Sequence, residues 1–364
     1  MVPRALSATC LKRSDSISQE PTNTDNIKGM SNDRNQASTR HHFLQRAYLD
    51  RFTENGRIDV VLRQTGEART GQRTNAIANV RGLYTSTDED GNKDGSLEGA
   101  FAQEIEGPAI RIINNAASVF PYVPMDDERA ILASYIALQY LRTPEAKRRY
   151  ETDAGRLAAI EIFNRVNSPK ELRKFLKAKG EDTSKKALAI YRQKALQDLK
   201  KYTIVPDNNG WLALIAEGLK LLTPILLRRY RWHIFYYESS SLITSDHPVI
   251  VRQINKSTAG VGFQNADEII FPLGKKHCLI LTTDPTLGEI VHFIKGEEHV
   301  DMLNELIFHG SYLEIYSPPS VSGKFKGRPL GKRAITTMSG GPSEGIEFLN
   351  HYSGVLDRDN PLRH

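Results

Sequence analysis

Helical and strand-like segments are segregated along this chain. Between residues 96 and 228, apolar residues recur at spacings of three and four, as in MDDERAILASYIALQYLRT, which is typical of amphipathic helices. From residue 229 to 317 the pattern changes to short β-branched and aromatic runs such as EIIFPLG and KHCLILTT, which predict strands of an antiparallel sheet. Because the two kinds of segment do not alternate, we predict an α+β fold.

The predicted domain is a single unit over residues 39–317. It begins with a small strand unit around RIDVVLRQ, continues with a central helical bundle or array over about residues 96–228, and ends with an antiparallel sheet and a packed helix over about residues 229–317. Residues 1–38 are polar and lack apolar periodicity, whereas residues 318–364 are rich in Gly, Ser, Pro and basic residues. Both ends are therefore predicted to be mostly disordered tails.

Positive charge is concentrated in one part of the helical region. Residues 145–201 contain sixteen Lys and Arg but eight Asp and Glu, so this segment carries +8 in a chain whose total charge is +6. Clustered cations release counterions when they bind a phosphate backbone, which makes nucleic acid the predicted partner of these helices. The alternative is that Lys and Glu simply solvate the outer faces of long helices.

Cysteine usage and hydropathy bear on the compartment. Cys10 and Cys278 are far apart, which excludes a disulfide framework and is typical of a reducing cytosol. We identify no uninterrupted apolar span of membrane length, and the N-terminal residues lack the apolar core of a secretory signal. We therefore expect a cytoplasmic protein without a membrane partner. Nothing in the sequence indicates an oligomeric state.

An ordered series of short motifs runs through the predicted domain: HHFLQRAYLDRF, LEGAFAQEIE, ALQYLRTP, ITSDHPV, FPLG and MLNELIFHGSYLEIYS. In order and approximate spacing, over residues 41–317, these motifs resemble an uncharacterised, mostly microbial family known as domain of unknown function 4238. That family usually has Pro before the aliphatic–aromatic pair that follows the His, where this chain has Leu44 or Gln45. The resemblance implies a shared architecture and brings no established activity.

The first candidate residues are the histidines at the start of the domain. His41 and His42 precede a predicted helix, and a histidine there can ligate a metal or act as a general base near neutral pH. One of the pair can equally cap the helix or bond to the backbone. We predict that His42 is the catalytic residue that handles a proton.

Two glutamates suggest a metal site. Glu98 and Glu106 are eight residues apart, which on a continuous α-helix brings their side chains within roughly 80° of each other. Together with Asp246, they are predicted to hold a divalent cation, Mg or Mn. The alternative is that the helix macrodipole favours acidic residues in a first turn.

Polar residues also interrupt an apolar helix and a pair of strands. Gln139 and Arg142 share one helix face among apolar neighbours, so Arg142 can clamp a phosphate or pair with Glu98 or Asp246. Ser245 and Asp246, in SDHP, separate two predicted strands, where they form a turn or a site. We predict that Gln139, Arg142 and Ser245 bind substrate and that Asp246 is catalytic as well as metal-binding.

These residues match no established pattern of nucleophilic or zinc catalysis, and the Cys in the folded region lies in an apolar run. The predicted function is a metal-dependent, nuclease-like phosphodiester hydrolase that acts on nucleic acid. Two alternatives are a non-catalytic module that binds nucleic acid or protein, and a sensor of a small anionic ligand. Grouping of His42, Glu98, Arg142 and Asp246 in space would favour the hydrolase or the sensor.

Overall fold

The computed structural model describes residues 10–13, 40–119, 121–238, 241–254, 260–286, 290–294 and 297–332. The chain divides into two compact units. The larger unit comprises residues 37–147 and 212–336, and the smaller unit comprises residues 1–36, 148–211 and 337–364. The single domain predicted over residues 39–317 includes most of the larger unit and residues 148–211 of the smaller one.

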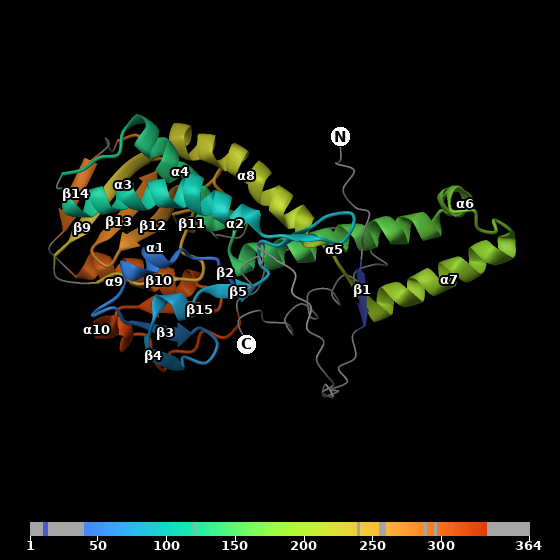
Figure 1. The fold of residues 1–364 in the computed structure, drawn as a ribbon, viewed down its shortest axis with the longest axis horizontal. Helices are drawn as coiled ribbons and strands as arrows, with labels where there is room; N and C mark the ends of the chain where they lie inside the picture. The colour runs from blue at the N-terminus through green and yellow to red at the C-terminus, as the bar shows by residue number, and fades with distance from the viewer. Residues whose placement is uncertain are drawn as a thin grey trace, which may run out of the picture. The chain divides into compact units, whose positions relative to one another are not determined.

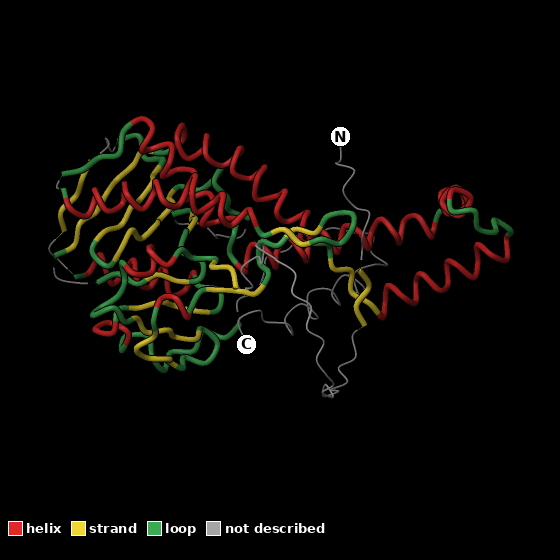
Figure 2. Tube along the Cα trace, viewed as in Figure 1, coloured by secondary structure: helices red, strands yellow, loops and turns green. Residues whose placement is uncertain are grey.

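The larger unit contains a four-stranded and a five-stranded sheet (Figures 1 and 2). In the four-stranded sheet the order is β10 (Thr244–Ser245), β15 (Glu314–Ser317), β3 (Ile58–Leu62) and β4 (Ala68–Gln72), and all neighbours are antiparallel. β15 therefore joins a strand from the start of the domain to the segment that contains SDHP. Every residue of β15 is buried.

The five-stranded sheet has the order β11 (Ile250–Arg252), β12 (Glu268–Gly274), β13 (His277–Thr282), β9 (Arg231–Tyr237) and β14 (Ile290–Ile294). Its pairs are antiparallel except β9 with β14, which is parallel. Two short ribbons complete the strands: β2 (Arg40–His42) with β5 (Asn79–Arg81), and β6 (Ser86–Thr87) with β7 (Lys93–Asp94).

Helices α3 (Gly107–Ser118), α4 (Asp126–Leu141) and α8 (Asn208–Arg229) lie along the five-stranded sheet (Figure 1). Aromatic side chains make the contacts: Tyr135 of α4 meets Phe271 of β12 edge-on, and the Tyr236 hydroxyl of β9 donates to the Ala116 carbonyl of α3. Helix α9 (Glu298–Gly310) packs against β10 and β11. The shorter helices are α1 (Arg46–Asp50), α2 (Ser96–Phe101), α10 (Pro319–Ser322) and the 3₁₀ turn η1 (Thr74–Ala76).

The smaller unit is mainly helical. Helix α5 (Pro144–Asn167) leads into α6 (Pro169–Ala178) and α7 (Lys185–Lys201), and β8 (Tyr202–Val205) pairs with β1 (Cys10–Arg13). The end of α5, α6 and α7 share one apolar cluster, formed by Val166, Leu172, Leu176 and Leu188. This cluster gives the α6–α7 hairpin its own core.

The folded chain continues past the predicted boundary at residue 317. Phe325 is buried and its ring lies 5.2 Å from that of Phe308 on α9, while the Leu330 amide donates to the Arg63 carbonyl at 2.9 Å. Residues 318–332 thus belong to the larger unit, because this aromatic contact anchors them. The rest of the two tails predicted to be disordered lies outside the described residues, except β1.

Helix α8 is only partly buried, although its sequence is apolar. Leu214 and Leu221 are 46% and 68% exposed. The helix has apolar residues on all its faces, but only one face packs against the rest of the fold. By length and composition alone α8 could cross a membrane, with a mean hydropathy of 1.5 and 22% of its apolar window buried. Glu217 and Lys220 interrupt this apolar stretch, and a core helix of a soluble protein meets the same criterion.

The predicted α+β class is confirmed: helices and mostly antiparallel sheets occupy separate stretches of the described chain.

Candidate functional site

Three polar side chains lie in one buried row on α4. Tyr135, Gln139 and Arg142 are spaced by four and three residues, so they share a helix face, and their exposed fractions are 0%, 0% and 2%. Several of their polar atoms have no hydrogen-bond partner among the described residues: the Tyr135 hydroxyl, both amide atoms of Gln139, and Nε and Nη2 of Arg142. Buried polar groups are nearly always satisfied, so this row marks a place suited to a polar ligand or ordered water.

The RTP motif explains the position of Arg142. Thr143 and Pro144 end α4 after Leu141, because Pro144 has no N–H and starts α5 as its first residue. The Thr143 hydroxyl caps the new helix by accepting a hydrogen bond from the Ala146 amide at 3.2 Å. Arg142 is the C-cap of α4, where the helix dipole favours a cation.

Glu106 is the ionic partner of Arg142. Its carboxylate forms an ion pair with the Arg142 guanidinium, and both side chains are buried. Burial lowers the pKa of Arg142, but Glu106, Tyr84 and Tyr135 together raise it, and the net pKa lies above its ordinary value. Arg142 is therefore charged inside the fold.

A π-helical turn brings Glu98 and Glu106 to one side of their helix. The segment η2 (Ala102–Glu106) lies between α2 and α3, and the Gly107 amide bonds to the Ala102 carbonyl five residues back. A π turn inserts one extra residue, so the eight-residue spacing behaves as about seven α-helical positions, close to two full turns.

Tyr84 links the two glutamates to Arg142. Its hydroxyl donates to the Arg142 carbonyl at 3.4 Å, and its ring meets Phe101 edge-on. Burial raises the pKa of Tyr84, Arg142 lowers it, and Glu106 and Glu98 raise it further. Both glutamates and the arginine thus act on the same phenol.

His41 has a structural position. It is fully buried and its ring is stacked on Tyr84 at 5.6 Å. Nδ1 accepts a hydrogen bond from the Tyr84 amide at 2.7 Å, so in the neutral ring the proton is on Nε2, which lies 3.8 Å from Oε2 of Glu98. His41 therefore connects β2 to Tyr84 and to Glu98.

His42 differs from His41 in its unpartnered ring nitrogen, which is an acceptor in His42 and carries the proton in His41. Its backbone amide donates to Glu98 Oε1 at 3.3 Å, whereas Nε2 has no hydrogen-bond partner among the described residues. Burial lowers the pKa of His42, which Glu98 and a backbone hydrogen bond with Asn75 partly offset. Because Nε2 has no partner, the hydrogen bond with the Asn75 backbone is made by Nδ1. The neutral ring therefore keeps a lone pair on Nε2. We call the whole group the Arg142 cluster: His41, His42, Tyr84, Glu98, Glu106, Tyr135, Gln139 and Arg142.

The SDHP segment forms a different buried group. Both carboxylate oxygens of Asp246 accept backbone hydrogen bonds, from Tyr312 at 2.8 Å, Leu313 at 2.6 Å and Glu314 at 3.2 Å. The Ser245 hydroxyl donates to the His247 carbonyl at 2.9 Å and accepts from the His247 amide at 3.2 Å. Ser245 and Asp246 thus tie β10 to the start of β15.

Charged neighbours surround SDHP. His247 Nδ1 lies 3.1 Å from Glu145 Oε2, and both side chains are buried. The pKa of Asp246 is raised to about 7. Burial is the main cause, and Glu314 and Glu145 also raise the pKa, whereas the amide bonds from Tyr312 and Leu313 lower it. The largest electrostatic influences on Arg142 are instead Glu106, Tyr84 and Tyr135, none of which belongs to SDHP.

A family model described as "Protein of unknown function (DUF4238)" matches residues 40–320. The chain belongs to this family. No curated protein and no solved structure matches it. The DUF4238 match confirms the resemblance drawn from the motifs, and it includes the Arg142 cluster and SDHP alike.

Of the site residues predicted from the sequence of this DUF4238 protein, five come together in the Arg142 cluster: His42, Glu98, Glu106, Gln139 and Arg142. Asp246 and Ser245 instead contact the backbone around β15. Nor does any group of three or more His, Cys, Asp or Glu side chains converge as metal ligands within the described ranges. Glu106 forms an ion pair with Arg142, and the carboxylate of Asp246 accepts hydrogen bonds from backbone amides. These two predicted metal ligands therefore have separate partners.

Two aromatic members of the cluster were not predicted as site residues. Tyr135 lies four residues before Gln139, and this helical spacing was a usable signal. Tyr84 follows a turn-rich stretch, and no local pattern associates it with Arg142 58 residues later.

Proposed function

We propose that this protein is a nuclease-like hydrolase that cleaves phosphodiester bonds, with the Arg142 cluster as its reactive centre. This proposal is supported mainly by the unpartnered Nε2 of His42, which lies beside a buried row of unpartnered donors on α4. Arg142, Gln139 and Tyr135 supply N–H and O–H groups suited to phosphate oxygens. Glu98 is 30% exposed and marks the side from which water and substrate approach.

In this proposal His42 Nε2 takes the proton of an attacking water. The water oxygen forms a bond to phosphorus as the bond to the leaving oxygen breaks, and the leaving oxygen is protonated by solvent. The lowered pKa of His42 keeps its ring neutral at pH 7, which a general base requires. Glu98 orients the two histidines, and Glu106 orients Arg142.

A divalent ion remains a prediction. Magnesium commonly binds through one or two carboxylates together with substrate phosphates and water. Glu98 fits such a role because its carboxylate is partly exposed, whereas Glu106 and Asp246 do not, because their oxygens already serve Arg142 and three amides.

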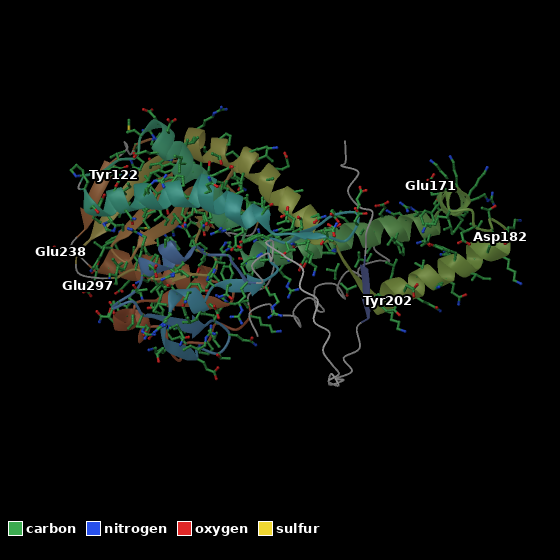
Figure 3. The ribbon with its side chains drawn as sticks, viewed as in Figure 1. Tyr122, Glu171, Asp182, Tyr202, Glu238 and Glu297 are labelled. Atoms are coloured by element: carbon green, nitrogen blue, oxygen red, sulfur yellow. The ribbon has the colours of Figure 1, made fainter. Side chains whose placement is uncertain are left out.

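The charge on α6 supports nucleic acid as the substrate. Lys170, Arg173, Lys174 and Lys177 follow the spacing of one helix face and are exposed, opposite the buried Leu172 and Leu176. Glu171 is the acidic residue of α6, and nitrogen-tipped side chains project around it (Figure 3). A helix face this rich in cations matches a phosphate backbone.

Removing that basic face should weaken binding and flatten its salt dependence. The variant Lys170→Gln/Arg173→Gln/Lys174→Gln/Lys177→Gln, titrated with duplex DNA at several salt concentrations, should lose a slope of about 3–4 in log K against log salt, because each cation releases about 0.9 counterion. The matched control is Arg81→Gln/Lys93→Gln/Arg111→Gln/Lys220→Gln, four exposed cations elsewhere. Equal slopes in wild type and both variants would remove α6 from the binding surface.

The catalytic proposal is tested by cleavage. Purified wild type, incubated with labelled single- and double-stranded RNA and DNA, with and without Mg²⁺ or Mn²⁺, should cleave at least one substrate. His42→Ala should reduce the rate by about 10²–10⁴-fold, the usual contribution of a general base. The exposed His309→Ala is the matched control and should retain the wild-type rate.

Glu98→Gln should also slow cleavage, whereas Glu104→Gln, on an exposed part of η2, should not. A folded wild type that cleaves none of these substrates overturns the hydrolase proposal.

Burial of the donor row favours a second candidate, a sensor of a small anion. Gln139 and Tyr135 are fully buried, so a small anion reaches them more readily than a polymer does. In that case phosphate or a small phosphate ester should raise the melting temperature of wild type but not of Gln139→Leu, with no cleavage by either.

A further inference from the structure

The larger unit contains a cationic pocket where α8 meets β9. It has a volume of about 540 Å³ and is lined by four arginines, Arg129, Arg228, Arg229 and Arg231, together with Thr283 and Pro285. This volume falls within the range of pockets that hold small molecules. None of the lining residues is acidic.

Each arginine reaches the pocket from a fixed backbone. Arg228 and Arg229 occupy the last turn of α8, Arg231 begins β9, and Arg129 comes from the first turns of α4. The Arg129 guanidinium lies 5.0 Å from the centre of the Trp232 ring and donates to the Tyr230 carbonyl at 3.2 Å. Arg229 lies 5.8 Å from the Tyr230 ring centre. These contacts restrain two of the four cations beside the pocket.

Two ordinary explanations account for part of this charge. Cations in the last turn of a helix stabilise its free carbonyls, which applies to Arg228 and Arg229. Asp284, between the lining residues Thr283 and Pro285, interacts electrostatically with Arg231. Neither explanation removes the positive charge of the lining, because four arginines line one concave space and no lining residue is a carboxylate.

We infer that this pocket binds the phosphate group of a small phosphorylated molecule. Guanidinium groups present planar forks of N–H donors that match phosphate oxygens bidentately, and several arginines around one site favour more than one negative charge. The Thr283 side chain also lines the pocket, and its hydroxyl donates a long hydrogen bond to the Asp267 carbonyl at 3.5 Å. The inference does not depend on the proposed hydrolase, because no residue of the Arg142 cluster lines the pocket.

Calorimetric titration of the full chain with inorganic pyrophosphate tests the inference. Wild type should bind, and Arg228→Gln/Arg231→Gln should weaken binding at least tenfold. The matched control, Lys220→Gln/Arg57→Gln, removes two exposed cations outside the pocket and should bind as wild type does. Circular dichroism should show that all three proteins are folded.

Parallel titrations separate the sources of the phosphate group. A nucleoside triphosphate represents a free small molecule, and a short 5′-phosphorylated oligonucleotide represents a nucleic-acid end. Preference for the first supports the inference, whereas preference for the second would make the pocket part of a nucleic-acid surface and overturn it. Absence of pyrophosphate binding, equal binding by the pocket variant, or equally tight binding of the tricarboxylate citrate would also overturn it.

Discussion

Replacing Arg142 with methionine is expected to lower the free energy of unfolding by about 3–5 kcal/mol. Methionine is similar in length, so the main loss is the positive charge. Glu106 would then be left as a buried carboxylate, 6% exposed, without its ionic partner. Urea denaturation followed by circular dichroism should show the loss as a lower midpoint with an unchanged slope.

A double variant distinguishes loss of the charge pair from loss of packing. Arg142→Met/Glu106→Leu removes both charges, and apolar replacement of a buried pair is often neutral, so it should recover most of the stability lost in the single variant. Arg111→Met, on an exposed position of α3, should stay within about 0.5 kcal/mol of wild type. A double variant as unstable as the single one would mean that Arg142 stabilises the fold by packing and not through Glu106.

The members of the Arg142 cluster were partly predictable, but their arrangement was not. Histidine before a helix and Arg142 in an apolar helix stand out in a sequence, because such groups need partners or a task. The pairing of Arg142 was predicted with Glu98 or Asp246, whereas the structure pairs it with Glu106. The π turn that aligns Glu106 with Glu98 departs from the α-helical period on which the prediction rested.

Long-range pairing explains the remaining differences. The sequence of SDHP predicts a turn that bonds its own backbone, and Ser245 does so with His247. Asp246 instead bonds amides 66 to 68 residues later, which only the pairing of β10 with β15 brings near. The fold class needed no such knowledge, since it follows from local periodicity alone.

Asp246→Ala is expected to lower the free energy of unfolding by about 3 kcal/mol or more, because three backbone amides lose their acceptor. Asp246→Asn retains one acceptor oxygen and should lose about half as much. Hydrogen exchange should accelerate at the amides of residues 312–314 in both variants before it does so elsewhere. The matched control is Asp284→Ala, in an exposed turn, whose unfolding midpoint should match that of wild type.

The pH dependence of this effect has a definite sign. The folded-state pKa of Asp246 is about 7, above the ordinary value of 3.8, so between these values the folded state binds the extra proton. Stability contributed by Asp246 is therefore largest at low pH and falls as the pH rises through 7. The advantage of wild type over Asp246→Asn, which cannot titrate, should be larger at pH 5 than at pH 8.

Stability and activity of the same variants decide between the two interpretations of SDHP. If Asp246→Ala loses stability in this manner, and its remaining folded fraction cleaves at the wild-type rate per folded molecule, Asp246 is an anchor for β15. If Asp246→Ala keeps the wild-type unfolding midpoint and loses cleavage, the amide bonds of Asp246 do not stabilise the fold. Asp246 would then belong to the reactive centre, and the Arg142 cluster would be only part of it.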